Sequence, residues 1–477
     1  MQSLKLIQEQ MLSVVSGSDE FYSLVRQLEQ MSDAGDIEAA LYLSWVYSHQ
    51  GALKDFSRKS FLLCESIAQK TGHPVALERM ADLLLWGVGL EQDKTQSFKI
   101  YEMLAHRGML PLTTLAYLHS QGIGTRVDEF KASTQIILSA AQGDTLAFML
   151  LSYRYKVGLG VPVSGVLSCA FAELACLRKF PGASQNKEML KEYFSSIQEE
   201  EIQTMSKALR ENIESLANKV DLLAQRVSPQ SQEFSQKYMQ TVVENISSLG
   251  LKELSVNAEL RSANIETKSN NASDVRVISQ SPHILKVNNF ASFEECQYLI
   301  AQAQPILETT LTQIKKHIGV EVDAFSGESA ILSNRQTSPV NRIIQQRFAD
   351  LLDTTVDKFE PISVLKYSVG HEYGLHTDAF DEKRIQDHKS KGDFGGQRIT
   401  TNLIYLLPAI EGGHTCYESI NKKIAGETGM AIIHYNVTSD NKPDPKSLHL
   451  GKEIKKGEKW LLRTATRQFP LYATNKI

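Results

Sequence analysis

Glycines at regular intervals mark a repeat with a period near 36 residues in the first 180 residues. This repeat constrains the possible folds more than any other feature of the sequence. One series of glycines precedes apolar segments at intervals of 37, 36 and 35 residues: Gly35, Gly72, Gly108 and Gly143. A second series follows those segments: Gly51, Gly87, Gly122 and Gly158. Two glycine breaks per period predict helix–turn–helix units, which can bury their apolar faces only against one another. We therefore expect an α-helical solenoid over residues 1–180.

The order of residues within each unit resembles that of Sel-like repeats, a subclass of the tetratricopeptide (TPR) family. A unit contains alanine, an aromatic residue, Gly-x-Gly, and then Lys-x-x followed by AAxxG, as between Lys131 and Gly143. The resemblance covers residues 35–180. It implies an array that binds a protein or peptide along its concave face. A rigid spacer or a dimer scaffold is the alternative.

Residues 181–260 predict a helical connector. Its apolar residues are spaced by threes and fours and form a near-heptad seam: Ile202, Met205, Leu209, Ile213, Leu216, Val220, Leu223 and Val227. The seam could join two chains as a homodimer. The short seam and the unordered flanking charges favour packing on the chain's own neighbouring domain. The polar stretch that follows predicts a linker over residues 261–281.

Residues 282–477 change to a strand-like periodicity. Ser292 and Glu295 have the spacing of a capping box that opens a helix, and a second helix follows Pro339. Apolar runs at PISVLKY, TTNLIYLL, MAIIHY and KWLLRTA predict antiparallel strands. We expect a double-stranded β-helix, or jelly roll, with helices that buttress one sheet. The chain is thus a multidomain α + β protein.

A His-x-Asp pair and a distant histidine provide candidate metal ligands. His376 and Asp378 alternate along a predicted strand and can face the same side, and His449 follows 71 residues after Asp378. Two histidines and one carboxylate on one face of an octahedron are the ligands of non-haem Fe(II) oxygenases. Lys459, ten residues after His449, is suited to pair with the distal carboxylate of 2-oxoglutarate.

These spacings, with GGQRITTNLIYLLPAIEGGHT between the metal motifs, resemble the catalytic domain of collagen-type and algal prolyl 4-hydroxylases. The resemblance implies Fe(II) bound by His376, Asp378 and His449. It assigns 2-oxoglutarate to a second set of residues: Lys459, Tyr367 and Thr415. It also places Tyr373 near the substrate and gives Arg398 a role in holding a peptide. O2 is the second co-substrate, succinate and CO2 are the by-products, and ascorbate is a candidate reductant.

The chain departs from the family pattern at two positions on the expected substrate side. His414 stands in Gly-Gly-His-Thr, where the family often has Gly-Gly-Glu-Thr, and Ala465 replaces a tryptophan. Both substitutions leave the predicted iron and co-substrate residues intact, but they put in doubt whether proline is the residue that is hydroxylated. The charged stretch from Phe380 to Gly396 predicts a loop, either a lid over the site or a solvated surface segment. We expect His371, His414 and His434 to be pocket-lining or structural residues.

The leading hypothesis is a hydroxylase that acts on a protein or peptide recruited by the repeats. Hydroxylation of a free amino acid or small metabolite, and an inactive binding scaffold, are the alternatives. The near balance of 51 basic and 55 acidic residues gives no sign of a nucleic-acid or anionic-membrane partner. No apolar run approaches the roughly 18–20 residues of a membrane helix. Five scattered cysteines predict reduced thiols in the cytoplasm.

Overall fold

The computed structural model describes residues 3–11, 18–49, 54–87, 90–226, 237, 275–311, 315–317, 320–322, 326–332, 338–390 and 395–471. The chain forms two compact units, residues 1–92 with 271–477, and residues 93–270. The first unit therefore combines the first five helices with the strands. The domain boundaries predicted at residues 180, 260 and 281 remain predictions.

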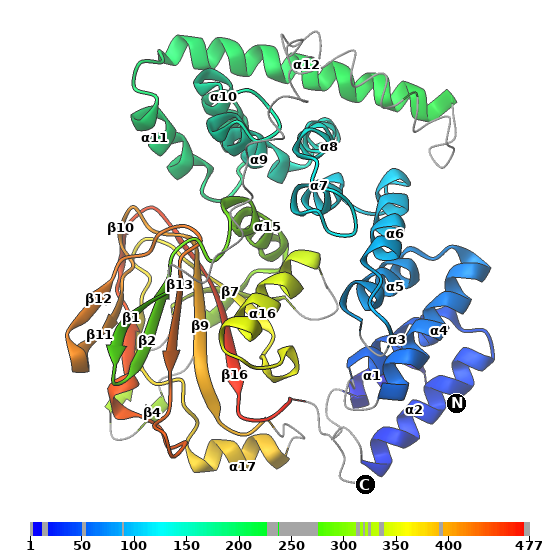
Figure 1. Cartoon of the computed structure of the whole chain (residues 1–477), viewed down its shortest axis with the longest axis vertical. Helices are drawn as coiled ribbons and strands as arrows, with labels where there is room; N and C mark the ends of the chain where they lie inside the picture. The colour runs from blue at the N-terminus through cyan, green and yellow to red at the C-terminus, as the bar shows by residue number, and fades with distance from the viewer. Residues whose placement is uncertain are drawn as a thin grey trace. The chain divides into compact units, whose positions relative to one another are not determined.

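Helices fill the repeat region as the glycine pattern predicts (Figure 1). In the first unit they are α1 (Leu4–Met11), α2 (Asp19–Asp33), α3 (Ile37–His49), α4 (Lys54–Thr71) and α5 (Pro74–Trp86). In the second unit they are α6 (Lys94–His106), α7 (Leu112–Gln121), α8 (Glu129–Ala141), α9 (Thr145–Val157), α10 (Gly165–Leu177), α11 (Ala183–Tyr193) and α12 (Glu199–Arg226). The prediction of an N-terminal helical repeat region is confirmed.

The Gly-x-Gly turns end one helix and let the chain touch an earlier one. Gly122 closes α7 in the left-handed conformation, with φ at 65°. A Cβ on Gly124 would lie 2.0 Å from the Lys94 carbonyl oxygen, and a Cβ on Gly160 would lie 2.0 Å from that of Glu129. Because no side chain fits at that distance, Gly124 and Gly160 are each required for packing against the preceding repeat.

Replacing Gly124 by alanine should destabilise the repeats more than the same change at Gly108. Both glycines have positive φ, but a Cβ on Gly108 would meet open space. Gly108→Ala should cost about 1–2 kcal/mol of unfolding free energy, from backbone strain alone. Gly124→Ala should cost roughly 1–3 kcal/mol more, because its methyl group meets the Lys94 carbonyl. Urea denaturation of the two variants measures the difference, and equal losses would contradict the packing role.

The predicted near-heptad seam is buried against the chain's own helices. Ile202, Leu209, Ile213 and Leu216 on α12 are buried, and α12 packs on α10 and α8 within the same unit. A dimer through this seam would have to expose these side chains. Val220, Leu223 and Val227 lie outside the residues whose side chains the structure describes.

An eight-stranded sheet forms one layer of the C-terminal region, in the order β1-β2-β13-β9-β16-β7-β6-β3. Its strands are β1 (Val275–Gln280), β2 (His283–Val287), β13 (Ala431–Tyr435), β9 (Arg398–Leu407), β16 (Lys459–Arg467), β7 (Ile362–Tyr367), β6 (Ser326–Leu332) and β3 (Glu308–Leu311). Each neighbouring pair is antiparallel. Helix α15 (Phe293–Ala303) opens with the predicted capping box and packs on this large sheet; α16 (Pro339–Leu351) packs on α15.

A four-stranded sheet forms the other layer, in the order β12-β11-β14-β8. Its strands are β12 (Lys422–Ile424), β11 (Thr415–Tyr417), β14 (His449–Gly451) and β8 (Tyr373–His376). Two-stranded pairs join β10 (Glu411–Gly412) to β15 (Ile454–Lys456), and β4 (Lys315–His317) to β5 (Val320–Val322). A large and a small antiparallel sheet make the jelly roll that the sequence predicts.

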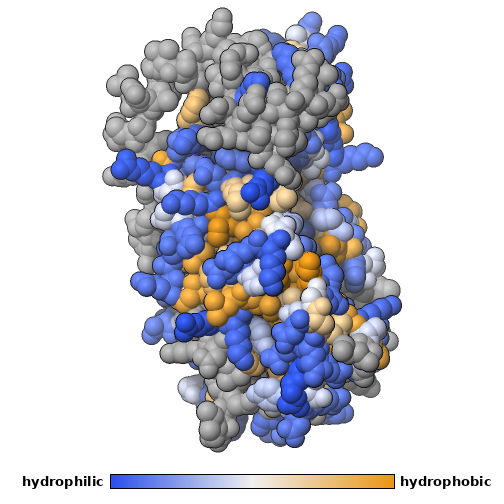
Figure 2. All heavy atoms as spheres, turned by 90° about the vertical axis from the view of Figure 1, so that its right-hand side faces the viewer, coloured by the Kyte–Doolittle hydropathy of each residue, from blue (hydrophilic) through white to orange (hydrophobic). Residues whose placement is uncertain are grey.

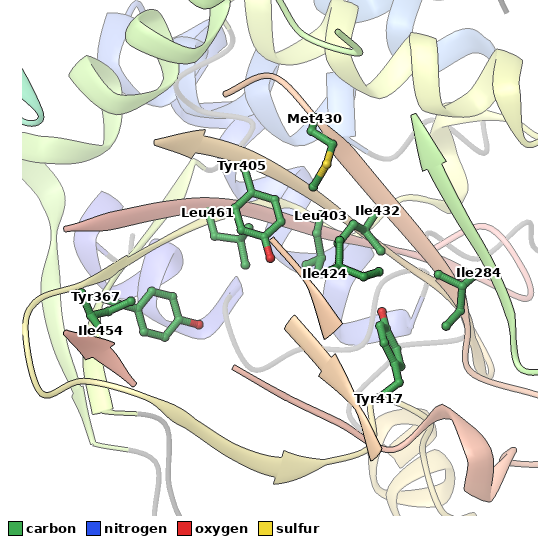
Figure 3. Close-up of a cluster of buried hydrophobic side chains, with 10 residues drawn as sticks. All are labelled: Ile284, Tyr367, Leu403, Tyr405, Tyr417, Ile424, Met430, Ile432, Ile454 and Leu461. Atoms are coloured by element: carbon green, nitrogen blue, oxygen red, sulfur yellow. The ribbon is translucent and has the colours of Figure 1, made fainter. Parts of the chain in front are cut away.

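Apolar and phenolic side chains from both sheets fill the space between the layers (Figure 3). Tyr367 and Tyr405 come from the large sheet, and Tyr417 comes from the small sheet. All three are buried, and Figure 3 shows their hydroxyl groups in the interior. Burial raises the pKa of Tyr405 to about 12, so its hydroxyl stays protonated and can donate a hydrogen bond.

Two segments differ from the sequence-based expectation. The linker predicted over residues 261–281 lies outside the described residues up to 274, but Val275–Gln280 form β1, an edge strand of the large sheet. The loop predicted over residues 380–396 contains α17 (Glu382–Ser390). The many charged side chains of this segment gave no apolar pattern that would predict a helix. Its N-terminus is capped, because the Asp381 carboxylate accepts a hydrogen bond from the Arg384 backbone N–H at 2.7 Å.

The surface mixes polar and apolar areas. Figure 2 shows polar side chains around an apolar area near the middle of the face it draws. No helix in the described part of the chain is long and apolar enough to span a membrane.

Candidate active site

The His-x-Asp pair and the distant histidine come together in the small sheet. His376 ends β8, Asp378 lies two residues beyond it, and His449 begins β14. These two strands pair directly, with His449 opposite His376. One ligand atom from each of the three residues lies within 4.8 Å of the others. Strand pairing thus brings residues more than 70 positions apart to one point.

The protonation of these side chains suits a divalent metal. The Nδ1 atoms of His376 and His449 lie 2.8 Å and 3.0 Å from the carbonyl oxygens of Gly374 and Ser447. An N–H at Nδ1 leaves the lone pair of Nε2 for a metal. Burial lowers the pKa of both histidines, so both are neutral. Two neutral imidazoles and one carboxylate fit Fe(II).

The carboxylate of Asp378 is buried and surrounded by donors. Burial raises its pKa, but the positive charge of Arg463 and the neighbouring histidines together outweigh that effect and hold the pKa well below its usual range. Arg463 Nη2 lies 3.5 Å from Asp378 Oδ1. Thr401 donates a hydrogen bond to Asp378 Oδ2 at 2.7 Å. Asp378 is therefore ionised and held in one orientation before any metal binds.

His434 lies behind Asp378. Its Nδ1 is 2.8 Å from the Tyr417 hydroxyl, and its Nε2 is 3.7 Å from Asp378 Oδ2. The ring is fully buried, and Nε2 has no hydrogen-bond partner among the described residues. If Tyr417 donates to Nδ1, Nε2 carries the proton and points it at the carboxylate. The sequence predicted a structural role; the apolar run around His434 gave no sign of its contact with Asp378.

His434→Phe should weaken metal binding. The phenyl ring fills similar space but removes the N–H near Asp378, and loss of such a supporting group typically costs about 10- to 100-fold in metal affinity. Anaerobic titration with Fe(II) by calorimetry measures the change. His434→Gln, which keeps an N–H donor, should retain more affinity than His434→Phe. His414→Phe is the control, and equal affinities in all four proteins would contradict the role.

Lys459 faces the same pocket from the large sheet. It begins β16 opposite Tyr367 on β7, and its side chain is buried. Its ammonium group donates a hydrogen bond to the Gly413 carbonyl oxygen at 2.8 Å and lies 4.9 Å from the centre of the Tyr405 ring. A Cβ on Gly413 would lie 3.3 Å from Lys459 Cδ, so a larger residue would crowd the lysine.

The other residues assigned to 2-oxoglutarate also line this pocket. Tyr367 and Thr415 are both buried and lie on its wall with Lys459. The Thr415 and Tyr405 hydroxyls are 2.6 Å apart. The pocket wall therefore combines the metal ligands with the Lys459 ammonium group and two hydroxyl groups. An α-keto dicarboxylate fits this arrangement, because one end can reach the metal while the other pairs with Lys459.

The affinity for 2-oxoglutarate should fall as the pH rises above 7. Burial lowers the pKa of Lys459 to about 7, so the free protein loses this charge above neutral pH. A dicarboxylate binds the protonated lysine, and the apparent Kd should rise by about tenfold per pH unit above 7. Anaerobic titration between pH 6 and 8.5 tests this. Lys459→Arg keeps its charge throughout and should show no such slope; a flat profile for the unmodified chain would count against the prediction.

The two residues predicted near the substrate differ in position. The Tyr373 ring stacks on the His376 ring, with centroids 3.8 Å apart, and lines the pocket. Arg398 instead pairs with Glu360 through two hydrogen bonds of 2.7 Å and 2.8 Å, and it is not among the described residues that line the pocket. Arg463 lines the pocket in its place. Arg463 was not among the site residues predicted from the sequence.

His414 and Ala465, the two positions that depart from the family pattern, do not line the pocket within the described part of the chain. The predicted lid does not line it either. His414 is half-buried outside it, and Ala465 is buried with its carbonyl oxygen bonded to the Glu360 N–H. Helix α17 contributes no lining residue, and its His388 stacks on the buried Phe380. His371 accepts a hydrogen bond from the Ser368 backbone N–H at Nδ1. The lid and the surface segment both stay predictions for residues 380–396, whose described part includes the buried Phe380.

Two antiparallel sheets that carry a His-Asp-His cluster and a buried lysine in one pocket define an Fe(II)- and 2-oxoglutarate-dependent oxygenase. No family model matches the chain. Prolyl 4-hydroxylase 1 of Arabidopsis thaliana is 33% identical over 211 residues, which cover 40% of this chain and 71% of the plant protein. Prolyl 4-hydroxylase 5 of the same plant is 30% identical over 205 residues, or 39% and 68% of the two chains. The chain belongs to the prolyl 4-hydroxylase family.

Solved structures resemble each part of the chain. A viral collagen prolyl hydroxylase from Paramecium Bursaria Chlorella virus-1, solved as a 2OG complex, is 24% identical and covers 39% of this chain and 96% of its own, with a TM-score of 0.31. A protective antigen of uropathogenic Escherichia coli with an SLR fold is 18% identical and covers 52% of this chain and 47% of its own, also with a TM-score of 0.31.

Proposed function

We propose that the protein hydroxylates a prolyl residue of a protein or peptide with Fe(II), O2 and 2-oxoglutarate. The reaction places one oxygen atom of O2 in a C–H bond of the substrate and the other in succinate, with release of CO2. The observation that carries the proposal is the shared pocket of His376, Asp378, His449 and Lys459 in a chain of the prolyl 4-hydroxylase family.

The residues of the pocket divide the work of binding. His376, Asp378 and His449 would hold the metal, which together with 2-oxoglutarate and O2 supplies the oxidising chemistry. Lys459 would bind the distal carboxylate of 2-oxoglutarate, and the protonated Tyr367 and Thr415 hydroxyls would donate hydrogen bonds to it. The buried pocket walls exclude water from the reacting carbon. Tyr373, stacked on His376, forms the wall beside which the substrate would enter.

The helical repeats would recruit or orient the substrate. Repeat arrays use the surface of stacked helices to bind extended partners. Exposed apolar side chains on the repeats include Leu62, Val75 and Val127. We propose that such side chains contact the protein substrate away from the reacting residue.

Hydroxylation of a free amino acid is a second candidate function. The family tryptophan is replaced by the small, buried Ala465. Two residues along the same strand, Arg463 presents a guanidinium group to the pocket. Such a group is suited to a substrate that carries its own carboxylate.

A proline-containing peptide library incubated with the full chain tests the proposed function. Mass spectrometry should find a gain of one oxygen atom on proline, with equimolar conversion of 2-oxoglutarate to succinate. His376→Ala should abolish both, by at least about 10³-fold, because the metal site loses a ligand. Succinate formation without any hydroxylated peptide, but with hydroxylated free amino acid, would replace the first candidate with the second. An absence of turnover with Fe(II) present would sink both.

We further propose that the protein works in the cytoplasm. All five cysteines are free thiols, and four of them are buried. Unpaired thiols are typical of a reducing compartment, where iron also stays in the ferrous state. Imaging of a fluorescent fusion in cells of the source organism tests this location.

A further inference from the structure

Three arginines and two carboxylates form a cluster beside the metal ligands. We call it the arginine–carboxylate cluster: Arg398, Arg463, Arg467, Glu360 and Asp378. The guanidinium groups of Arg398 and Arg463 both approach Asp378 Oδ1, at 3.8 Å and 3.5 Å. Three positive charges against two negative charges leave the cluster with one positive charge in excess.

The three arginines are engaged to different degrees. Arg398 is held by Glu360 at 2.7 Å and 2.8 Å, and Arg467 donates to the Gly396 carbonyl oxygen at 2.7 Å. Arg463 lies 3.5 Å from Glu360 Oε2 and 3.5 Å from Asp378 Oδ1. These distances are longer than the roughly 2.7–2.9 Å of a strong charge-assisted hydrogen bond. The guanidinium group of Arg463 has five N–H groups and can therefore donate hydrogen bonds to a further anionic partner.

Arg463 is also the arginine of the cluster that lines the pocket within the described part of the chain. It alternates with Leu461 and Lys459 along β16, and all three face the pocket. Lys459 lies four residues away, about 13 Å along the strand. The pocket lining therefore has two cationic positions, Lys459 and Arg463, and Arg463 is the one beside the metal ligand Asp378.

We infer that Arg463 binds a carboxylate of the substrate and so selects substrates that carry one on, or beside, the residue that is hydroxylated. The inference rests on the proposed function and names its substrate class. The planar guanidinium group matches a carboxylate through two parallel hydrogen bonds. The carboxylate can belong to an acidic side chain or C-terminus of a peptide, or to a free amino acid. The excess positive charge of the arginine–carboxylate cluster favours either source.

Matched pairs of ligands that differ only in a carboxylate test this inference. The first pair is a peptide blocked at both ends with Glu or Gln beside a single proline, with versions before and after it. The second pair is L-proline and L-prolinamide. Calorimetry measures binding to the full chain loaded with Mn(II) and 2-oxoglutarate without O2. In at least one pair the acid should bind about 10- to 100-fold more tightly than the amide, as expected for hydrogen bonds to a charged group.

Arg463→Gln should reduce this acid-to-amide ratio to about one, and Arg463→Lys should keep part of it. A purely structural role for Arg463 would weaken the acid and the amide equally and leave the ratio unchanged. Arg398→Gln is the matched control, because it removes one charge from the same cluster but lies outside the pocket lining. It should leave the ratio as it is in the unmodified chain.

Several outcomes would overturn the inference. They are equal or absent binding of acid and amide in every pair, a ratio that survives Arg463→Gln, an equal loss in Arg398→Gln, and a loss of 2-oxoglutarate binding in Arg463→Gln. Aerobic reactions with the same ligands separate this inference from the proposed function. Equal hydroxylation of the Glu and Gln peptides would leave the proposed function standing without the inference. Hydroxylation of L-proline but of no peptide would contradict the proposed function and leave the inference standing.

Discussion

The buried negative charge of Asp378 is the constraint on which the catalytic end of the barrel depends. A carboxylate in the interior is costly unless charged or hydrogen-bonding groups compensate it. Asp378 follows a strand of the small sheet, whereas Thr401 on β9 and Arg463 on β16 come from the large sheet. The charge can be accommodated only when both sheets are folded and in register. The metal site and the jelly-roll core therefore form together.

Much of this arrangement could be predicted from the sequence because it follows short-range rules. Alternation along a strand placed His376 and Asp378 on one side, and the spacing of Lys459 from His449 set the co-substrate end of the pocket. The glycine spacing predicted the helix pairs, because left-handed turns such as that at Gly122 need a residue without a side chain. The capping box at Ser292 gave the start of α15 from four residues alone.

The features that could not be predicted depend on which strands become neighbours. Arg463 sits in the apolar run of β16, and nothing near it in the sequence places it beside Asp378 or Glu360. The contact of His434 with Asp378 arises only because β13 pairs with β9 in the large sheet. Arg398 matched a substrate residue of the family, but its two hydrogen bonds to Glu360 join β9 to the segment just before β7. The helix α17 was missed because its mean composition is charged and its apolar positions are few.

The pocket draws its two ends from different sheets. The metal ligands belong to the small sheet and its edge, and Lys459 belongs to the large sheet. The Tyr405 and Tyr417 rings pack between these sheets and fix their separation (Figure 3). The separation of the sheets is thus related to the length of the keto acid that the pocket can bind. Because a close-packed core resists rearrangement, the separation of the two sheets sets the span that a bound keto diacid must cover between the metal ligands and Lys459.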